Sequence, residues 1–463
     1  MNSLSIFGTS SDAGKSTLSF AITYLLHKRG IKVAPFKAQN VSNNSQVCDD
    51  GGEIAIPQHF AAEAIGIATS HFMNPILLKS GSKNAAHLII NGKSVGEKDV
   101  WSYYKDIDTL KPFVKKAFKK LQTQYECIVA EGAGSPVELN LMDKDLSNIY
   151  VAKKFKTKII LVADIERGGV FASIYGVYKL LPKELRKNVI GVIVNKFRGD
   201  MSLFDEGIEI IQNRFGLRVL GVVPFLPFNL GFEDSQSLMG YTQDTSKALL
   251  KVGVLKLPHM SNFTDFEPLV ADGEIELSFI SNISELSSCQ LIVIPGSKRV
   301  VEDLAWLRER GFESSLVSKK QKVVAICGGY EMMFERISDP LGIESGEKEI
   351  KGFGRIKGDV IFEAEKTVKK GSYKLFGHKI QGYEIHNAQT KNLATKKKNL
   401  YGTFLHGLFD NDGIRYEIFS QIDKNYRGYN FKEYKKQSIK NFAQHIEKHV
   451  DIDFIVQNLH LGK

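Results

Sequence analysis

The sequence predicts an α/β protein with two domains, each built around a parallel β-sheet. The chain has 463 residues, which is too long for one ordinary hydrophobic core. Short apolar runs rich in β-branched residues alternate with stretches of helical periodicity. A polar stretch without periodicity, residues 232–247, separates two sets of such runs. We therefore expect a first domain at 1–232, a linker at 233–250, a second domain at 251–430 and a C-terminal helical extension at 431–463.

The composition is typical of a globular protein, with 43% hydrophobic and 25% charged residues and no apolar stretch long enough to cross a bilayer. The first expected strand begins at Leu4, with no signal segment before it. The four cysteines, Cys48, Cys127, Cys289 and Cys327, show no C-x-x-C spacing, so neither a zinc knuckle nor a disulfide framework is expected. We expect a cytoplasmic protein without a membrane partner.

The net charge of +10 is compatible with nucleic acid, a membrane surface or small polyanions as partners. The densest lysine clusters, at residues 396–398 and 432–440, are not interleaved with stacking aromatic residues. These clusters are interpreted as solvated faces, so no nucleic-acid partner is expected. Small polyanionic ligands fit the charge equally well.

A phosphate-binding loop follows the first expected strand, Leu4 to Phe7. Glycines let the backbone N–H groups curl around phosphate oxygens, a lysine reaches the terminal phosphates, and the hydroxyl after it binds Mg²⁺. Apolar residues at helical spacing follow the loop, and Gly30 marks the end of that helix. We therefore expect ATP and Mg²⁺, with Ser16 as a metal ligand. The candidate nucleotide-binding residues of the loop are Gly8, Thr9, Asp12, Gly14, Lys15, Ser16 and Thr17.

Polar residues end the other strands expected in the first domain, and parallel strands bring such ends to one edge of the sheet. Lys37 is placed to touch a phosphate or a substrate carboxylate; the alternative is a solvated surface lysine. Glu131 ends the buried run 127–130 and is the second candidate Mg²⁺ ligand, after Ser16. Asp164 ends another strand, although the segment after it also fits a simple turn.

Cys327 is the candidate nucleophile of the second domain. It lies between a buried apolar run, 323–326, and a helix expected to start near Tyr330, an arrangement that exposes the thiol and offers helix N-terminal N–H groups. A second strand ends at His406, and a third ends in a turn at Gly296. A thiol nucleophile needs a base and N–H donors, and these segments supply candidates for both. The alternative is a buried structural cysteine.

These three segments resemble a class I glutamine amidotransferase domain. The resemblance implies that Cys327 attacks the side-chain amide of glutamine, that His406 shuttles the proton, and that the N–H groups of Gly328 and Gly296 form the oxyanion hole. Most of that superfamily carries a glutamate two residues after the histidine, where this chain has Leu408. The departure implies the branch that works with a Cys-His pair, found in enzymes that amidate the carboxylates of corrin precursors.

The phosphate loop has five residues between Gly8 and Gly14 instead of the usual four, a variant that resembles dethiobiotin synthetase and its amide-ligase relatives. Taken together, the motifs resemble the cobyric acid synthase family in one continuous order. These motifs lie at residues 8–17, 35–40, 131–136, 164–171, 195–200, 327–330, 382–386 and 402–410.

The family resemblance implies amidation of the b, d, e and g carboxylates of adenosylcobyrinic acid a,c-diamide, a corrinoid substrate, with ATP, Mg²⁺ and glutamine. Each carboxylate would be activated as an acyl phosphate, which ammonia then attacks. Asn195 resembles the asparagine that reads adenine in related folds.

Three alternatives remain beside another corrinoid carboxylate amidotransferase of the same build. The sister enzyme, cobyrinic acid a,c-diamide synthase, has the same two domains, but it usually reads Glu-Gly-Val-Met-Gly where this chain has Glu131-Gly132-Ala133-Gly134. A ParA-like partitioning ATPase would carry an additional lysine early in the phosphate loop, which is missing between Gly8 and Gly14. The third is a protein with a decayed amidotransferase domain, which the presence of both Cys327 and His406 disfavours. The residues that hold the corrin, the path of ammonia and the oligomeric state are left open.

Overall fold

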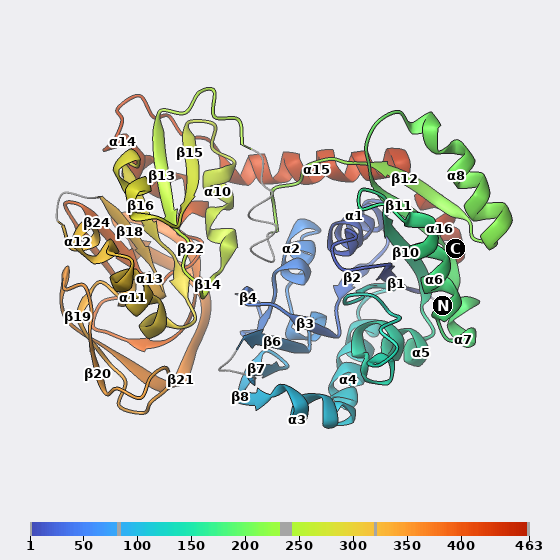
Figure 1. The fold of residues 1–463 in the computed structure, drawn as a ribbon, viewed down its shortest axis with the longest axis horizontal. Coiled ribbons are helices and arrows are strands. Elements are labelled where there is room, and N and C mark those ends of the chain that lie inside the picture. Colours follow the sequence, from blue (N-terminus) through green and yellow to red (C-terminus); the bar gives the residue numbers. More distant parts are fainter. Residues whose placement is uncertain (1, 81–84, 232–242, 319–321, 461–463) are drawn as a thin grey trace. The chain divides into compact units, whose positions relative to one another are not determined.

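The structure, a computed structural model, describes residues 2–80, 85–231, 243–318 and 322–460 and divides into two compact units (Figure 1). The first unit contains Met1–Phe228 and Lys436–Lys463, and the second contains Asn229–Lys435. Residues 233–242 of the predicted linker, 233–250, lie outside the described residues. Both units contain a largely parallel sheet, so the predicted fold class is confirmed.

The first unit is built around a six-stranded sheet in the order β12-β11-β10-β1-β9-β2, with every neighbouring pair parallel. Its strands are β1 (Ser3–Gly8), β2 (Val33–Phe36), β9 (Cys127–Glu131), β10 (Lys158–Asp164), β11 (Val189–Phe197) and β12 (Val219–Pro224). Strand β1 lies between β9 and β10, so Gly8 and Glu131 are brought to the same carboxyl edge of the sheet.

Helices connect these strands and bury apolar side chains against the sheet. Helix α1 contacts β1, β2 and β9, whereas α4 and α6 contribute to two apolar clusters with the strands. The helices are α1 (Lys15–Lys28), α2 (Ile56–Ala64), α3 (Val100–Lys105), α4 (Lys111–Gln122), α5 (Val151–Phe155), α6 (Val170–Leu180), α7 (Lys183–Arg186) and α8 (Asp205–Glu209).

Two small sheets are inserted between β2 and β9. One has the order β3-β6-β7-β8, and the other pairs β4 with β5. Their strands are β3 (Gln39–Val41), β4 (Ser45–Val47), β5 (Glu53–Ala55), β6 (Ile76–Ser80), β7 (Ala85–Ile90) and β8 (Lys93–Asp99).

The second unit has its own six-stranded sheet in the order β15-β13-β16-β18-β24-β23, parallel except for the edge pair β24-β23. Its strands are β13 (Leu250–Leu255), β15 (Ile275–Ile280), β16 (Leu291–Ile294), β18 (Val323–Ile326), β23 (Ala394–Lys397) and β24 (Leu400–Thr403). Helices follow at α10 (Glu267–Val270), α11 (Val300–Glu309), α12 (Phe312–Val317), α13 (Gly328–Glu331) and α14 (Asp412–Ser420).

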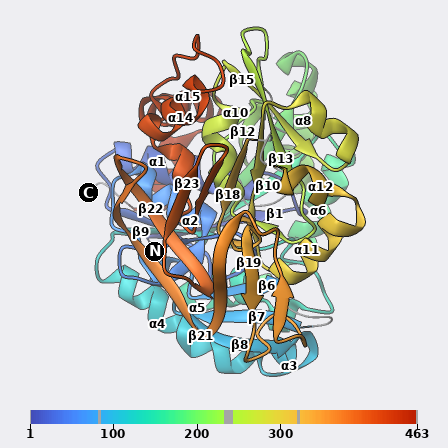
Figure 2. The same ribbon diagram turned by 90° about the vertical axis from the view of Figure 1, so that its left-hand side faces the viewer.

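A second, four-stranded sheet of this unit is dominated by the long β21-β22 hairpin, which Figure 2 shows in orange. Its strands are β19 (Phe334–Ser338), β20 (Glu349–Lys351), β21 (Ile356–Leu375) and β22 (His378–Gln389), and a short pair joins β14 (Met260–Ser261) to β17 (Gly296–Ser297). Most of the segment 356–389 is therefore one hairpin.

The helix expected to run on from Tyr330 is only one turn long. Helix α13 ends at Glu331, and strand β19 begins at Phe334. The backbone carbonyls of Met332 and Met333 accept hydrogen bonds from Phe353 and Ile356, at 2.7 and 2.9 Å, instead of from the next helical turn. Pairing with a distant segment therefore overrides the local helical pattern.

The predicted C-terminal extension is helical, with α15 at Phe431–His449 and α16 at Ile452–Asn458. From Lys436 onward it groups with the first unit. Phe442 stacks on Phe228 with ring centroids 4.5 Å apart, and Arg29 pairs with Glu447 at 2.9 Å. These contacts attach the end of the chain to the unit that contains its beginning.

Candidate active site

The phosphate loop lies between β1 and α1, as predicted. Gly14 caps α1 in the left-handed conformation, with φ of +94°. A Cβ atom there would lie 2.1 Å from Nδ2 of Asn195, so only glycine fits. Lys15 is buried, and its Nζ donates to the carbonyl oxygen of Ser10 at 2.9 Å. The loop therefore folds around its own lysine, with the helix N-terminus open to an anion.

Glu131 is the centre of a buried polar cluster at the end of β9. Its Oε1 accepts hydrogen bonds from Ser16 Oγ and Lys37 Nζ, both at 2.8 Å. Its Oε2 accepts one from Gln58 Nε2 at 3.0 Å. The two predicted metal ligands, Ser16 and Glu131, are thus in direct contact, and Lys37 is a buried partner rather than a solvated lysine.

The oxygen atoms of Ser16 and Glu131 fit Mg²⁺, a hard cation that takes one or two protein oxygens and completes its shell with phosphate and water. Within the described part of the chain, no group of three or more His, Cys, Asp or Glu side chains is arranged to hold a metal by itself. A site of this kind suits a metal that arrives with a nucleotide.

The other predicted residues of this edge serve the loop itself. Asn195 Nδ2 donates to the carbonyl oxygen of Ala13 at 3.0 Å, and Thr17 Oγ1 donates to that of Gly14 at 3.0 Å. Asp12 pairs with Arg167 at 3.2 Å on the surface. Asn195 therefore braces the phosphate loop; its suggested contact with adenine stays a prediction.

Asp164 lies beside Asn195 in the β10-β11 register. It is buried, accepts from the backbone N–H of Glu166 at 2.8 Å, and pairs with Lys196 Nζ at 3.0 Å. These contacts are enough to account for a buried carboxylate in structural terms.

Cys327 occupies a strained turn between β18 and α13. Its φ of 49° and ψ of −115° are unusual for a residue with a side chain, and such strain concentrates at functional sites. A Cβ atom on Gly328 would lie 2.8 Å from the backbone nitrogen of Ser297, so the turn needs glycine after the cysteine. The predicted strand-turn-helix elbow is therefore present, but the expected exposure of the thiol is wrong, because Cys327 is only 5% exposed.

His406 is completely buried and held on both ring nitrogens. Nδ1 lies 2.7 Å from Oδ2 of Asp265, and Nε2 lies 2.9 Å from Nδ2 of Asn262. Because the amide nitrogen of Asn262 can only donate, Nε2 accepts, and Nδ1 carries the proton that it donates to Asp265. The other oxygen of Asp265 accepts the backbone N–H of Gly407 at 2.7 Å. This tautomer has its basic lone pair on Nε2.

Asp265 is the site residue that sequence reasoning missed. It lies in the 3-10 helix Phe263–Phe266, on a segment to which the sequence analysis gave no role. Most class I glutamine amidotransferases carry a glutamate two residues after the histidine. This chain has Leu408 there, which is fully buried in the core. The absence of that glutamate suggested a Cys-His pair, whereas the structure supplies a carboxylate from a distant segment.

The backbone brings the segments of Cys327 and His406 together. The N–H of Cys327 donates to the carbonyl of Thr403 at 2.8 Å, three residues before His406. Tyr383 forms a backbone bridge with His406 and stacks on its ring, while the Cys327 thiol donates to the carbonyl of Ile385 at 3.7 Å. Strand β22 therefore contacts both residues.

The two predicted oxyanion-hole glycines lie in the same region. A Cβ atom on Gly296 would lie 3.0 Å from Cε1 of His406. The N–H of Gly328 donates a hydrogen bond to the Cys327 sulfur, and this hydrogen bond by itself lowers the pKa of the thiol. Burial outweighs that effect and, with the nearby Glu331 carboxylate, raises the pKa of Cys327 well above its usual range. In this state the sulfur is a thiol, and a base is needed to activate it.

His386, from the same hairpin as Tyr383, is satisfied by its neighbours. Its Nδ1 bonds to the carbonyl of Ala388 at 2.7 Å, its Nε2 pairs with Glu384 at 3.2 Å, and its ring stacks on Phe404. Buried and bonded in this way, His386 has the contacts of a structural core histidine.

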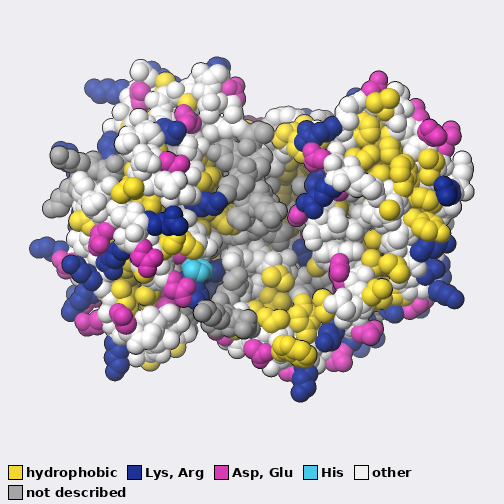
Figure 3. Space-filling model, viewed as in Figure 1, with side chains coloured by type: hydrophobic (Ala, Val, Ile, Leu, Met, Phe, Trp, Pro, Cys, Tyr) yellow, Lys and Arg dark blue, Asp and Glu magenta, His cyan; other side chains and the backbone are white. Residues whose placement is uncertain are grey.

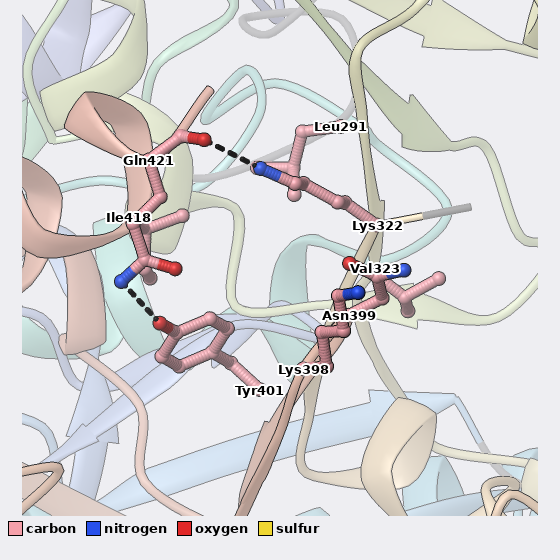
Figure 4. A pocket seen from close by; sticks show the side chains of 8 residues that line it. All are labelled: Leu291, Lys322, Val323, Lys398, Asn399, Tyr401, Ile418 and Gln421. Carbon is pink, nitrogen blue, oxygen red and sulfur yellow. Dashed lines mark hydrogen bonds between the residues drawn. The ribbon is translucent and has the colours of Figure 1, made fainter. Parts of the chain in front are cut away.

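A small pocket lies at the amino ends of strands in the six-stranded sheet of the second unit (Figure 4). Its lining includes Leu291 and Val323, the first residues of β16 and β18, whereas Cys327 follows the last residue of β18. Lys322 Nζ donates to the carbonyl of Gln421 at 2.8 Å, and Gln421 Nε2 donates to the Tyr401 hydroxyl at 3.0 Å. The pocket is separate from the candidate site.

On the face that Figure 3 draws, Lys and Arg side chains are scattered and interspersed with Asp and Glu. None of the helices within the described ranges combines the length and the apolar character needed to span a bilayer.

Two family models match the chain, one over each of its two sheets. Residues 4–229 match the family model of the CobQ/CobB/MinD/ParA nucleotide binding domain, and residues 251–414 match the CobB/CobQ-like glutamine amidotransferase domain. A solved glutamine amidotransferase structure covers 37% of this chain and 97% of its own, with 15% identity and a TM-score of 0.30.

Two curated relatives extend over almost the whole chain. A cobyric acid synthase of Acinetobacter baylyi is 52% identical, with 99% of each chain covered. One of Ruminiclostridium cellulolyticum is 37% identical, covering 99% of this chain and 97% of the relative. Similarity of this extent includes both units and both candidate sites, and the chain therefore belongs to the cobyric acid synthase family.

Proposed function

We propose that this protein converts adenosylcobyrinic acid a,c-diamide to adenosylcobyric acid by amidating its b, d, e and g carboxylates, with ATP and glutamine consumed for each. One observation carries the proposal: a single chain holds both a phosphate loop joined to Glu131 and a buried cysteine-histidine-aspartate cluster. Full-length similarity to cobyric acid synthases supports the substrate. The same clusters argue against a decayed amidotransferase domain.

In the second unit, Cys327 would attack the side-chain amide carbon of glutamine. His406 Nε2 takes the thiol proton and returns it to the leaving ammonia, while Asp265 holds the Nδ1 proton and stabilises the imidazolium that forms. Because the Asn262 amide donates to Nε2, it must shift before Nε2 can take the thiol proton. The N–H groups of Gly328 and Gly296 would stabilise the oxyanion, and water then releases glutamate from the thioester.

In the first unit, the phosphate loop would hold ATP with Lys15 and Lys37 neutralising the charge of the transferred γ-phosphoryl group. Mg²⁺ held by Ser16 and Glu131 would add to that neutralisation when bound. The substrate carboxylate attacks the γ-phosphorus, the bond from this phosphorus to the β,γ-bridging oxygen breaks, and ADP leaves. Ammonia then displaces phosphate from the acyl phosphate. A carboxylate is a poor electrophile at neutral pH, which is why this activation is needed.

The four cysteines are free, which suits a catalytic thiol working in the reducing cytoplasm. We place the protein there.

A mass-spectrometric assay tests the proposal. The protein is incubated with ATP, Mg²⁺, glutamine and the a,c-diamide, beside a Cys327→Ala variant supplied with glutamine or with an ammonium salt. Four successive amidations by the unsubstituted protein, lost in the variant on glutamine and restored by ammonium, are expected. Amidation of cobyrinic acid in place of the a,c-diamide would instead assign the sister activity, and no amidation of either would refute a corrinoid substrate.

A further inference from the structure

Gln58 is a buried residue that the proposed reaction has not yet used. It lies in the first turn of α2, with 2% of its surface exposed. Its Nε2 donates to Glu131 Oε2 at 3.0 Å, and its Oε1 is buried without a hydrogen-bond partner among the described residues. The orientation of this amide is determined, because a flip would place its oxygen against a carboxylate oxygen.

A buried acceptor without a partner is costly, and in a native protein it calls for an explanation. Here it lies next to the carboxylate that Ser16 and Lys37 also contact. A ligand that donates a hydrogen bond to Gln58 Oε1 would remove the cost at the moment it binds.

The chemistry of the cluster narrows the choice of that ligand. Lys15, Lys37, Ser16 and the loop N–H groups are donors, which suit phosphate and carboxylate, since both of these only accept. The oxygens of Glu131 already accept three hydrogen bonds, two on Oε1 and one on Oε2. Ammonia is the reactant that attacks the acyl phosphate, and its N–H donors need an acceptor there.

We propose that Gln58 Oε1 accepts a hydrogen bond from the ammonia that attacks the acyl phosphate, and so orients the nitrogen lone pair toward the acyl carbon. The proposal rests on the proposed function. The C–N bond forms, the C–O bond to phosphate breaks with its electron pair leaving on the phosphate oxygen, and one ammonia proton ends on the phosphate. The amide oxygen is too weak a base to take that proton; its part is to bind and orient.

A neutral acceptor has a further advantage at this position. A carboxylate would also bind ammonium, which has no lone pair and cannot attack. Gln58 favours neutral ammonia because it adds no negative charge to the binding site.

The test uses the Cys327→Ala protein supplied with ammonium salt, so that only the synthetase half is measured. Two readouts are taken. One is the KM for ammonium in amide formation. The other is the carboxylate-dependent positional isotope exchange, without ammonia, of ATP labelled with ¹⁸O at the β,γ-bridging oxygen, which reports acyl phosphate formation. Adding Gln58→Met, which removes the acceptor at similar volume, is expected to raise the KM for ammonium at least tenfold, about 1.4 kcal/mol, while isotope exchange persists.

Ser19→Ala is the matched control. Ser19 Oγ is also buried and without a partner among the described residues, but it lies in α1 and not beside Glu131. This substitution is expected to leave the KM for ammonium unchanged.

An unchanged KM for ammonium in Gln58→Met would overturn the proposal, whatever happens to kcat. The proposal would also be overturned if Gln58→Met raised the magnesium concentration needed for isotope exchange and left the KM for ammonium unchanged. The acceptor would then bind metal-bound water. If Gln58→Met does not fold, Gln58→Glu restores an acceptor: a lower KM for ammonium with a lower kcat supports the proposal, and an unchanged KM refutes it. If the Cys327→Ala protein with Gln58 unchanged shows neither isotope exchange nor amidation, the proposed function itself is refuted.

Discussion

Nδ1 of His406 lies 2.7 Å from Oδ2 of Asp265, although 141 residues separate the two in the chain. The second oxygen of Asp265 holds the backbone N–H of Gly407 at 2.7 Å. The same carboxylate therefore fixes both the ring and the backbone of the histidine. In the mechanism that we propose, Asp265 does the work of the glutamate that most related domains carry where this chain has Leu408.

The substitution Asp265→Asn tests this relationship. The new side chain would keep the volume of the carboxylate but could present an N–H to Nδ1 of His406 and favour the wrong tautomer. The kcat of glutamine hydrolysis is therefore expected to fall by about 10²- to 10⁴-fold. Amidation supported by ammonium salt should be retained. Glutamate release and ammonium-dependent amide formation are the two measurements.

Asp359→Asn is the matched control, because Asp359 makes a surface ion pair with Arg336 in the same unit. It should leave both rates near those of the unsubstituted protein. Equal loss of both activities in Asp265→Asn would show a general structural defect and contradict the assigned role.

Glu131→Gln addresses the other site. The substitution keeps the shape but removes the charge that receives hydrogen bonds from Ser16, Lys37 and Gln58. ATP-dependent amidation is expected to fall by about 100-fold or more, whereas glutamine hydrolysis in the other unit persists. Rates are compared across a magnesium titration, with the exposed Glu166→Gln as control. Full activity of Glu131→Gln at ordinary magnesium concentrations would refute a role of Glu131 in ATP-dependent amidation.

Gly14→Ala tests the left-handed cap of α1. The conformation itself costs a residue with a side chain about 1–2 kcal/mol, and the added Cβ would collide with Asn195. Gly66→Ala separates the two effects, because Gly66 has φ of +70° and open space around its Cβ position. We expect both variants to lose stability in denaturant unfolding, but only Gly14→Ala to lose ATP affinity in calorimetry. If Gly14→Ala and Gly66→Ala bind ATP with the same affinity, the proposed role of Gly14 in ATP binding is wrong.

Glu331 should make the stability of the protein depend on pH. Burial, and next the Glu344 carboxylate, raise the pKa of Glu331 well above the usual value of 4.5. The folded state therefore holds a proton that the unfolded state releases above that value, and stability is lost as the pH rises from about 4.5 toward the folded pKa.

Glu331→Gln removes this dependence. In urea unfolding it should therefore stabilise the protein at pH 8 relative to the parent and have little effect near pH 4.

The same substitution should also lower the pKa of Cys327, because the Glu331 charge helps to raise it. Iodoacetamide alkylation of Cys327 is then expected to set in at lower pH. The same pH profile for both proteins would refute this coupling.

Local sequence was enough to predict the parts of each candidate site that are built from consecutive residues. The phosphate loop from Gly8 to Thr17 and the elbow at Cys327 need particular residues at fixed spacing, because backbone N–H groups and tight turns allow few alternatives. Alternation of apolar runs with helical periodicity predicted the parallel sheets, and strand ends at Lys37 and Glu131 predicted one polar edge.

Only the tertiary structure decided which distant side chains meet. Asp265 reaches His406, and Gln58 reaches Glu131 across 73 residues, through packing that leaves no periodic signal in the chain. The same holds for α13, which ends after one turn because Phe353 and Ile356 take the carbonyls that a longer helix would use. A motif specifies a local backbone conformation, whereas a buried polar pair depends on how whole elements pack, since each partner is stable there only when the other arrives.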